Sequence, residues 1–222
     1  MTKLLIALFA HPDDEAFGPS GTLLKLRDEG YDIHLILLTD GDAGTNVDNV
    51  PDLAATRLAE WHASAELLGA RTTHALHYPD GGLQNIAAAE LEQAAATTIA
   101  AVIASYTAPV ELSFITFEPH GLTGHHDHIV ASDVAARMAE RFSARDIWYF
   151  CLDSSQAPLD GTAYYEPRAR EERYITTRVD VSAYLTRKYQ VIDAHISQRH
   201  DGAAMKTPGA ATECFHVDTV SS

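Results

Sequence analysis

The sequence predicts an α/β fold: a Rossmann-like, doubly wound and mostly parallel sheet with helices on both faces. Two observations lead to this prediction. Apolar runs alternate with helical patterns up to about residue 153, and the first run, residues 4–10, is continuously apolar. Continuous runs are typical of strands covered on both faces. Strands separated by helices of this length form βαβ units.

The predicted elements follow one another regularly in the first two thirds of the chain. Five strands are expected, over residues 4–10, 32–40, 73–80, 110–117 and 146–153. Helices are expected between them, over residues 21–29, 52–68, 87–105 and 126–142. The run 4–10 resembles a short signal peptide, but no cleavage site follows it and HPDDE comes at once. A buried strand is the better interpretation.

The C-terminal third is less regular. Residues 154–178 are rich in Pro, Gly, Tyr and Arg and predict an irregular excursion. Residues 180–200 predict a C-terminal helix, with Asp180 or Ser182 as its N-cap. No internal repeat interrupts the chain, so residues 1–222 are expected to form a single domain.

The charge balance limits what the protein can bind. Sixteen Lys and Arg residues against 31 Asp and Glu residues give a formal net charge of −15, which would repel a nucleic acid. We expect a small-molecule partner, and homo-oligomerisation stays open. No apolar run is long enough to span a bilayer, so we expect no membrane insertion and a cytoplasmic location. Cys151 and Cys214 are too few for a disulfide framework or a Cys-type zinc site.

Polar side chains follow four of the predicted strands at the point where each strand ends. The first strand leads into His11–Glu15, the second into Asp40, the third into Asp80 and the fourth into a loop that reaches His125–His128. In open α/β sheets, ligands bind beyond the carboxyl ends of the strands. We therefore expect these segments to converge at one edge of the sheet.

Two clusters among these segments have the composition of a metal site. In HPDDE, one of the adjacent carboxylates Asp13 and Asp14 can bind a metal while the other faces the open coordination position; the alternative is an acidic helix start. In GHHDH, His125 and His128 share a face if a helix has begun, which allows two imidazole ligands, or one ligand and one acid–base group. The alternative there is a polar cap. Together the clusters favour zinc or a similar first-row divalent ion.

AHPDDE followed by GHxDH after a later strand resembles the LmbE-like (PIG-L) deacetylases. These include enzymes that remove acetyl groups from N-acetylglucosaminyl-phosphatidylinositol and from precursors of mycothiol and bacillithiol. The resemblance implies one zinc ion per chain, held by His11, Asp14 and His128. It implies Asp13 as the general base that activates water on the zinc. It further implies that His125 stabilises the oxyanion or donates a proton, oriented by Asp127, whose hydrogen bond would raise its pKa and keep it cationic.

Other residues match the family more weakly. Arg57, Asp80 and His195 are expected to contact substrate, with a helix-surface salt bridge, a turn and domain packing as the respective alternatives. The chain also departs from the family. Members that act on mycothiol precursors carry a tyrosine where this chain has Thr123, so no oxyanion donor is expected from that position. His126 replaces a frequent proline.

The expected function is therefore zinc-dependent hydrolysis of an acetyl or other acyl amide on an N-acetylglucosamine-type substrate. One alternative is another metal-dependent hydrolase such as a phosphoesterase, for which Asp40 and Asp42 could supply further carboxylates while basic residues are scarce. A second alternative is a sugar-binding module without activity, which the intact ligand set and Asp13 argue against. The first strand-to-helix turn has no GxGxxG, so a dinucleotide site is poorly supported.

Overall fold

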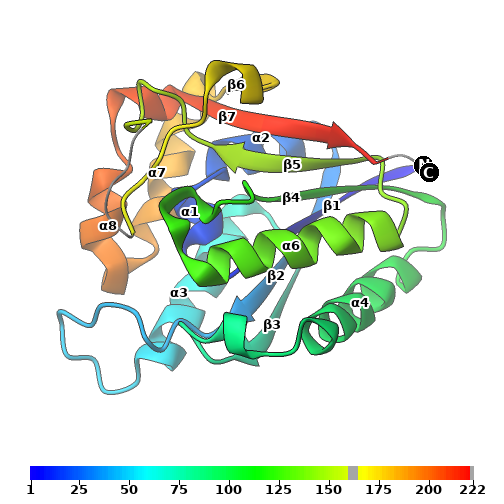
Figure 1. Cartoon of the computed structure of the whole chain (residues 1–222), viewed down its shortest axis with the longest axis horizontal. Helices are drawn as coiled ribbons and strands as arrows, with labels where there is room; N and C mark the ends of the chain where they lie inside the picture. Colours follow the sequence, from blue (N-terminus) through cyan, green and yellow to red (C-terminus); the bar gives the residue numbers. More distant parts are fainter. Residues whose placement is uncertain (160–164, 221–222) are drawn as a thin grey trace.

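The computed structural model describes residues 1–159 and 165–220. Its seven strands form one sheet in the order β3-β2-β1-β4-β5-β7-β6 (Figure 1). The strands are β1 (Thr2–Phe9), β2 (Tyr31–Thr39), β3 (Thr72–Tyr78), β4 (Val110–Phe117), β5 (Asp146–Cys151), β6 (Thr177–Asp180) and β7 (Thr212–Thr219). The first five are parallel, whereas β7 runs antiparallel to both β5 and β6. The prediction of a doubly wound, mostly parallel sheet is confirmed.

Helices cover both faces of this sheet. The α-helices are α1 (Asp14–Phe17), α2 (Ser20–Asp28), α3 (Leu53–Leu68), α4 (Ala88–Ala104), α5 (Gly121–Gly124), α6 (His126–Arg141), α7 (Leu185–Asp193) and α8 (Arg199–Ala204). Short 3-10 turns are η1 (Leu83–Asn85), η2 (Glu172–Tyr174), η3 (Ser182–Tyr184), η4 (Ile196–Gln198) and η5 (Pro208–Ala211). Figure 1 shows α4 and α6 in front of the sheet, while α2 and α7 lie behind it.

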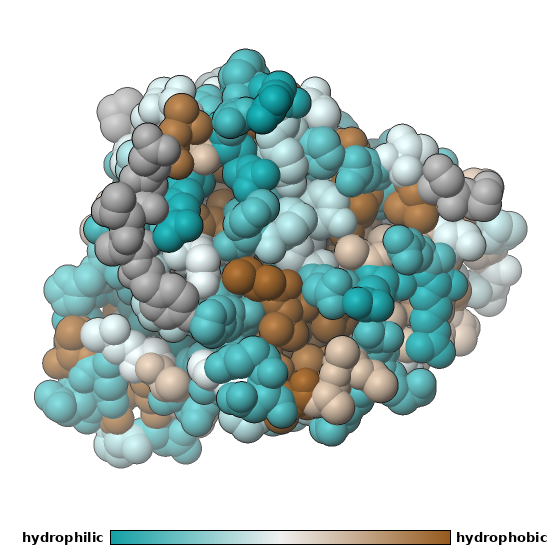
Figure 2. Space-filling model, in the orientation of Figure 1, coloured by the Kyte–Doolittle hydropathy of each residue, from teal (hydrophilic) through white to brown (hydrophobic). Residues whose placement is uncertain are grey.

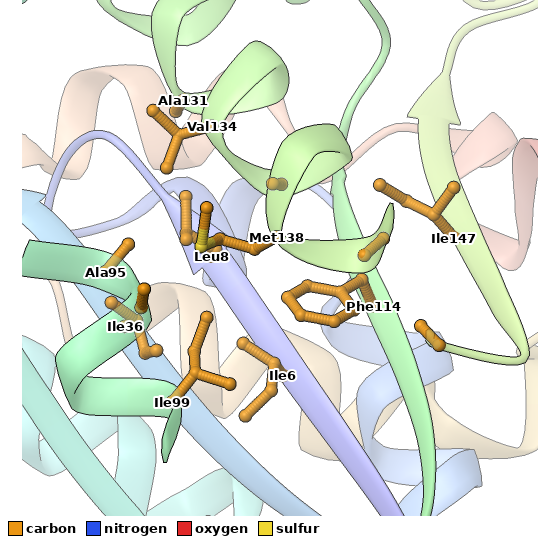
Figure 3. Close-up of a cluster of buried hydrophobic side chains, with 14 of the residues drawn as sticks. Ile6, Leu8, Ile36, Ala95, Ile99, Phe114, Ala131, Val134, Met138 and Ile147 are labelled. Atoms are coloured by element: carbon orange, nitrogen blue, oxygen red, sulfur yellow. The ribbon is translucent and has the colours of Figure 1, made fainter. Parts of the chain in front are cut away.

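The continuous apolar run of β1 is explained by two separate cores. Ile6 and Leu8 belong to the core under α4 and α6, whereas Ala7 and Phe9 belong to the core under α2, α3 and α7. Figure 3 shows Ile6 and Leu8 surrounded by side chains of α4 and α6. Because successive strand residues point to opposite faces, a strand buried on both faces must be apolar at every position. The interpretation of the first apolar run as a buried strand is confirmed.

The prediction of one helix over residues 180–200 is wrong. Asp180 ends strand β6, α7 begins only at Leu185, and the chain leaves helical geometry at His195. The reasons are tertiary. Strand β6 pairs with β7, and Ser197 makes two hydrogen bonds to the Glu60 carboxylate on α3, through its backbone N–H (2.8 Å) and its hydroxyl (2.7 Å). Local helix propensity gives way to these contacts.

Strand β7 is missing from the sequence prediction. It pairs antiparallel with β5, so that Cys214 lies opposite Cys151, and it carries the sheet on to β6. In the segment expected to be irregular, the described residues show the turn η2 and a single bridge between Leu152 and Ala169 before β6 begins. Residues 160–164 of that segment lie outside the described residues.

The topology places a crevice between β1 and β4. The chain runs from β1 to β2 and β3 on one side, and then returns to β4 on the other side of β1. The loops after β1 and β4 therefore diverge at a switch point, where ligands bind in sheets of this kind. In Figure 1 this edge of the sheet lies opposite the two chain termini.

None of the described helices is long and apolar enough to cross a membrane. Figure 2 shows a patch of apolar side chains on the face that carries α6. A groove of about 450 Å³ runs there between residues 83–91 and α6, and its described lining has a single carboxylate, Asp133, and no histidine. The groove does not have the side chains of a metal site.

Candidate metal centre

Two loops at the switch point bring three potential metal ligands together. His11 follows β1, Asp14 is the first residue of α1, and His128 lies in the first turn of α6. Between the first two, Asp13 adopts a φ of 135°, a strained value for a residue with a side chain. Such strain costs roughly 1–3 kcal/mol and is concentrated at functional sites.

The ligand atoms of these three residues face one another. His11 Nδ1 lies 3.1 Å from His128 Nε2, and His128 Nε2 lies 3.2 Å from Asp14 Oδ1. The other oxygen of the same carboxylate, Asp14 Oδ2, lies 3.7 Å from His11 Nδ1. Ligands about 2.0–2.2 Å from a tetrahedral zinc ion lie roughly 3.3 Å from one another. The spacing fits one ion of this size.

Hydrogen bonds on the far side of each imidazole fix its tautomer. His11 Nε2 lies 3.0 Å from Asp80 Oδ1, and His128 Nδ1 lies 3.1 Å from the Gly121 carbonyl oxygen. Both partners are acceptors, so these nitrogens carry the protons and the facing nitrogens carry lone pairs. Two lone pairs 3.1 Å apart repel each other unless a proton or a cation lies between them. The arrangement therefore suits a cation.

The Asp14 carboxylate is held in place by the backbone. Its Oδ2 accepts hydrogen bonds from the N–H groups of Ala10 (3.1 Å) and His11 (2.9 Å), which leaves Oδ1 directed at His128. Burial raises the pKa of Asp14, but the two histidines outweigh burial and hold the pKa well below 3.8. A carboxylate fixed in this way is preorganised as a ligand.

The structure gives Asp80 and Asp127 a different role from the one expected. Asp127 Oδ2 and Oδ1 accept the backbone N–H groups of Gly81 (2.7 Å) and Leu83 (3.0 Å), and Oδ2 lies 3.4 Å from His11 Nε2. The expectation that this carboxylate orients His125 is wrong. Asp80 Oδ1 contacts His11, and Oδ2 accepts a hydrogen bond from the N–H of Ala43 (3.0 Å). Asp80 therefore supports an imidazole, whereas it was expected to contact a substrate hydroxyl.

His125 is neutral in this environment, contrary to expectation. Burial lowers its pKa to about 4, with further lowering from the neighbouring histidines His128 and His11. Its Nδ1 accepts the backbone N–H of Asp127 (3.1 Å), so Nε2 carries the proton of the neutral ring. The ring stacks on His128 at 4.7 Å and lines the pocket. His125 is therefore a neutral N–H donor.

Arg57 lines the pocket and contacts Asp13, and its expected contact with substrate stays a prediction. Its guanidinium is buried and donates to Asp13 Oδ2 (2.9 Å), to the carbonyl of Pro12 (3.0 Å) and to that of Gly41 (2.8 Å). A Cβ atom at Gly41 or Gly44 would come within 2.6 Å of the guanidinium, so these glycines make room for it. Burial raises the pKa of Asp13 to about 6, and the Arg57 charge opposes this rise.

His195 is a packing residue, and its predicted contact with substrate is wrong. It is 1% exposed and is absent from the pocket lining. Its Nε2 lies 3.2 Å from Glu15 Oε1, which also accepts the hydroxyl of Ser64. Burial lowers the pKa of His195, but the bond to Glu15 outweighs it and raises the pKa above 6.5. The residue joins the C-terminal segment to α1.

The site opens into a pocket of about 560 Å³. Its lining includes Asp13, His125, Arg57 and Asp80, and also residues that the sequence did not single out for function: Phe17, Thr45, Tyr165 and Asp201. Phe17 comes two residues after HPDDE, whereas Thr45, Tyr165 and Asp201 belong to no motif, so sequence spacing gave no signal for them. Gly121 was also missed. Its φ of +69° and a Cβ position 2.9 Å from His128 Cβ require glycine there.

Among the described residues, two groups could hold a metal ion by proximity: His11, His125 and His128, and His11, Asp80 and Asp127. Both contain His11, through opposite ring nitrogens. In the second group both Asp127 oxygens accept backbone N–H groups, whereas Asp14 directs Oδ1, which accepts none, at His128; the second group is therefore better suited to support His11. Asp14 extends the first group to four donors.

Residues 6–139 match the model of the PIG-L family, described as GlcNAc-PI de-N-acetylase. The matched range is more than half of the chain and contains both AHPDDE and GHHDH. The chain belongs to this family. The family membership predicted from the two motifs is confirmed. The PIG-L family is generally metal-dependent.

Two curated relatives of this PIG-L protein are deacetylases. Diacetylchitobiose deacetylase of Thermococcus kodakarensis is 45% identical over 80 residues, which are 35% of this chain and 30% of that protein. The 1D-myo-inositol 2-acetamido-2-deoxy-alpha-D-glucopyranoside deacetylase of Saccharomonospora viridis is 25% identical over 229 aligned residues, or 87% of this chain and 84% of that protein. The second similarity extends along most of both chains.

Solved structures share the fold. GalB, the 4-carboxy-2-hydroxymuconate hydratase from Pseudomonas putida, has a TM-score of 0.71 at 16% identity, covering 100% of this chain and 99% of that chain. Deacetylases of N,N'-diacetylchitobiose and of teicoplanin are also similar in structure. Since a hydratase and deacetylases share the fold at such low identity, this likeness shows the fold alone.

Proposed function

We propose that the protein is a metal-dependent N-deacetylase that hydrolyses the acetamide of an N-acetylglucosamine-type substrate. The observation that carries the proposal is the convergence of His11 Nδ1, His128 Nε2 and Asp14 Oδ1 beside a separate carboxylate, Asp13, in one pocket. The named relatives act on acetamido sugars, which supports the substrate class.

We assign the metal to His11, Asp14 and His128, with one ion per chain and zinc as the expected ion. Imidazole and carboxylate donors are those of catalytic zinc sites, where three protein ligands leave a position open. A bound ion of this kind supplies Lewis acidity toward the amide carbonyl and toward water. Asp80, Asp127 and the Gly121 carbonyl orient the two imidazoles from outside.

Asp13 is the proposed general base. A pKa raised by burial to about 6 suits a group that accepts a proton near neutral pH. Arg57 binds Oδ2 and so orients the carboxylate toward the pocket. Asp13 takes a proton from the attacking water and returns it to the departing nitrogen. Amide and water thereby become acetate and an amine.

His125 is the proposed donor to the carbonyl oxygen. Its protonated Nε2 is available because Nδ1 is bonded to the backbone N–H of Asp127. Negative charge grows on the carbonyl oxygen as water attacks, and a fixed donor stabilises that charge without reorganisation. The neutral imidazole serves this purpose as a hydrogen-bond donor, with no need of a full positive charge.

The group formed by His11, Asp80 and Asp127 bears on the alternative function, that of a phosphoesterase. A two-metal phosphoesterase would need Asp80 and Asp127 as ligands of a second ion. Their oxygens instead accept hydrogen bonds from the N–H groups of Ala43, Gly81 and Leu83. This supports a single-ion amidase.

The test combines metal analysis with amine release. Purified protein is analysed for metal per chain and then assayed on N-acetylglucosamine, N,N'-diacetylchitobiose and N-acetylglucosaminyl-inositol. We expect one zinc per chain, amine release that a chelator abolishes and zinc restores, and a metal-loaded but inactive D13A control. Two ions per chain, with phosphate-ester hydrolysis and no amine release, would contradict the proposal.

A further inference from the structure

The segment after residue 164 forms part of the pocket wall. Two backbone hydrogen bonds fasten it to the loop that precedes His125. The N–H of Tyr165 donates to the carbonyl of Thr123 (3.1 Å), and that of Arg168 donates to the carbonyl of Leu122 (2.8 Å). Both Leu122 and Tyr165 have positive φ values, 59° and 68°, at this junction. Strained residues on both sides of one contact indicate a conformation fixed by its surroundings.

Tyr165 thereby comes to lie against the proposed oxyanion donor. Its ring centroid is 4.7 Å from that of His125, edge to face at 64°, and the residue lines the pocket. The contact fixes one side of the ring, while 51% of the residue is exposed. An exposed aromatic ring on a pocket wall presents apolar surface at low entropic cost.

The rest of the lining explains what this surface can bind. Among the described lining residues, only Phe17 and Tyr165 are aromatic apart from the histidines, and Asp13, Asp14, Asp80 and Asp201 are carboxylates. A sugar offers hydroxyl groups at its edge and C–H groups on its faces. The polar side chains suit the edge, and an aromatic ring suits a face.

We propose that Tyr165 is a specificity-determining residue whose ring packs against a sugar ring of the substrate next to the scissile acetamide. This inference rests on the proposed function, because it assumes an acetamido sugar in the pocket. It assigns binding to the ring of Tyr165 and no role in proton transfer to its hydroxyl. The residue reaches the site from a segment far from both motifs.

The experiment measures binding without turnover. Isothermal titration calorimetry of N,N'-diacetylchitobiose is carried out on zinc-loaded D13A protein, and on the same protein with Y165F, Y165L or Y165A added. We expect Y165F to bind within about threefold of its parent. Y165A should bind roughly 5- to 150-fold more weakly, the range found when an aromatic stacking partner of a nucleobase is truncated. Y165L should lie between them.

Three outcomes would overturn the inference or its premise, and they are distinguishable. Equal affinity of Y165A and its parent would show that the ring of Tyr165 does not contribute to substrate binding. If Y165F bound as weakly as Y165A, the hydroxyl of Tyr165 would be the group that binds substrate, and the proposed packing of the ring would be refuted. No binding to the D13A parent itself would contradict the proposed substrate class. Melting temperature and zinc content of each variant show whether a loss of affinity reflects a loss of folding.

The same variants in the active protein give a second readout. With Asp13 intact, Y165A should raise KM by a larger factor than it lowers kcat, because the main loss is uniform binding of substrate and the contact with His125 is the lesser one. A fall in kcat with unchanged KM would contradict the assignment.

Discussion

The groups proposed to act on substrate and two polar pairs near the C-terminus differ in their surroundings. The loops after β1 and β4 carry the groups proposed to act on substrate, and those groups line a pocket. Two polar residues near the C-terminus, Lys188 and His195, are instead buried in pairs away from the pocket. Lys188 contacts Glu213 at 2.6 Å, and His195 contacts Glu15 at 3.2 Å.

Each of these C-terminal contacts reaches back to the first half of the chain. Glu213 also accepts the N–H groups of Gly21 (2.9 Å) and Thr22 (2.7 Å) at the start of α2, and Ser197 bonds to Glu60 on α3. The C-terminal region therefore fastens the helices behind the sheet. The comparison separates polar groups that line the pocket from equally buried polar groups that join the C-terminal region to the helices behind the sheet.

The largest expected effect is the loss of turnover when residues of the loops after β1 and β4 are changed. D13A should keep one zinc per chain and lose about 10²–10⁴-fold in kcat, the contribution of a positioned general base. H128A should lose both zinc and activity, because it removes a proposed ligand. Metal content by mass spectrometry together with amine release separates the two. If D13A kept full turnover, Asp13 would be excluded from the mechanism.

Changes to the buried polar pairs near the C-terminus should lower the stability of the fold. K188M leaves the Glu213 carboxylate buried without its cation, which should lower the free energy of unfolding by about 3–5 kcal/mol. The zinc content and kcat of the folded fraction should stay unchanged. The matched control is K206M, since Lys206 pairs with the exposed Asp193 at the surface and should cost below about 1 kcal/mol. Equal losses in the two variants, measured by urea denaturation, would contradict this division.

A smaller effect is expected from the groups that support the imidazoles. D127N weakens the contact to His11 Nε2, so zinc affinity should fall about 10- to 100-fold while the fold persists. Competition with a chromogenic chelator measures this loss. If D127N had wild-type zinc affinity, Asp80 alone would orient His11, and the role assigned to Asp127 would be wrong.

The smallest effects concern pH, and two buried histidines should respond with opposite signs. Burial lowers the pKa of His34 to about 4, and the ring is bonded to the hydroxyls of Thr72 and Tyr106. The unfolded chain binds this proton more readily, so stability falls as pH drops from about 6.5 to 4. His195 has its pKa raised by Glu15, so its contribution is complete below pH 6.5 and is lost as pH rises through the raised value.

Denaturation of metal-free protein from pH 4 to 9 tests both signs. H34Q should flatten the acid side of the stability profile, and H195Q should flatten the alkaline side. Wild-type profiles in both variants would show that neither histidine is linked to folding in this way.

The fold of the first half could be predicted because its signals are local. The predicted strand 110–117 coincides with β4, and the predicted helix 126–142 differs from α6 by one residue. Burial on both faces imposes the apolar runs. Strands β6 and β7 could not be predicted in this way, because each depends on a partner strand distant in the sequence.

The site was predictable to the extent that motifs fix positions in space. His11, Asp14 and His128 follow the ends of adjacent strands, so topology alone brings them together. The role of Asp127 could not be predicted, because its direction is set by the N–H groups of Gly81 and Leu83. The same holds for Arg57, whose place depends on space left by two glycines.

Anomalous diffraction at the zinc edge, from crystals of the zinc-loaded protein, tests the central claim most directly. We predict one peak per chain, about 2.0–2.2 Å from His11 Nδ1, His128 Nε2 and an Asp14 oxygen. A peak on the other side of the His11 ring, among Nε2, Asp80 and Asp127, would contradict the assignment of both the ligands and the groups that orient them.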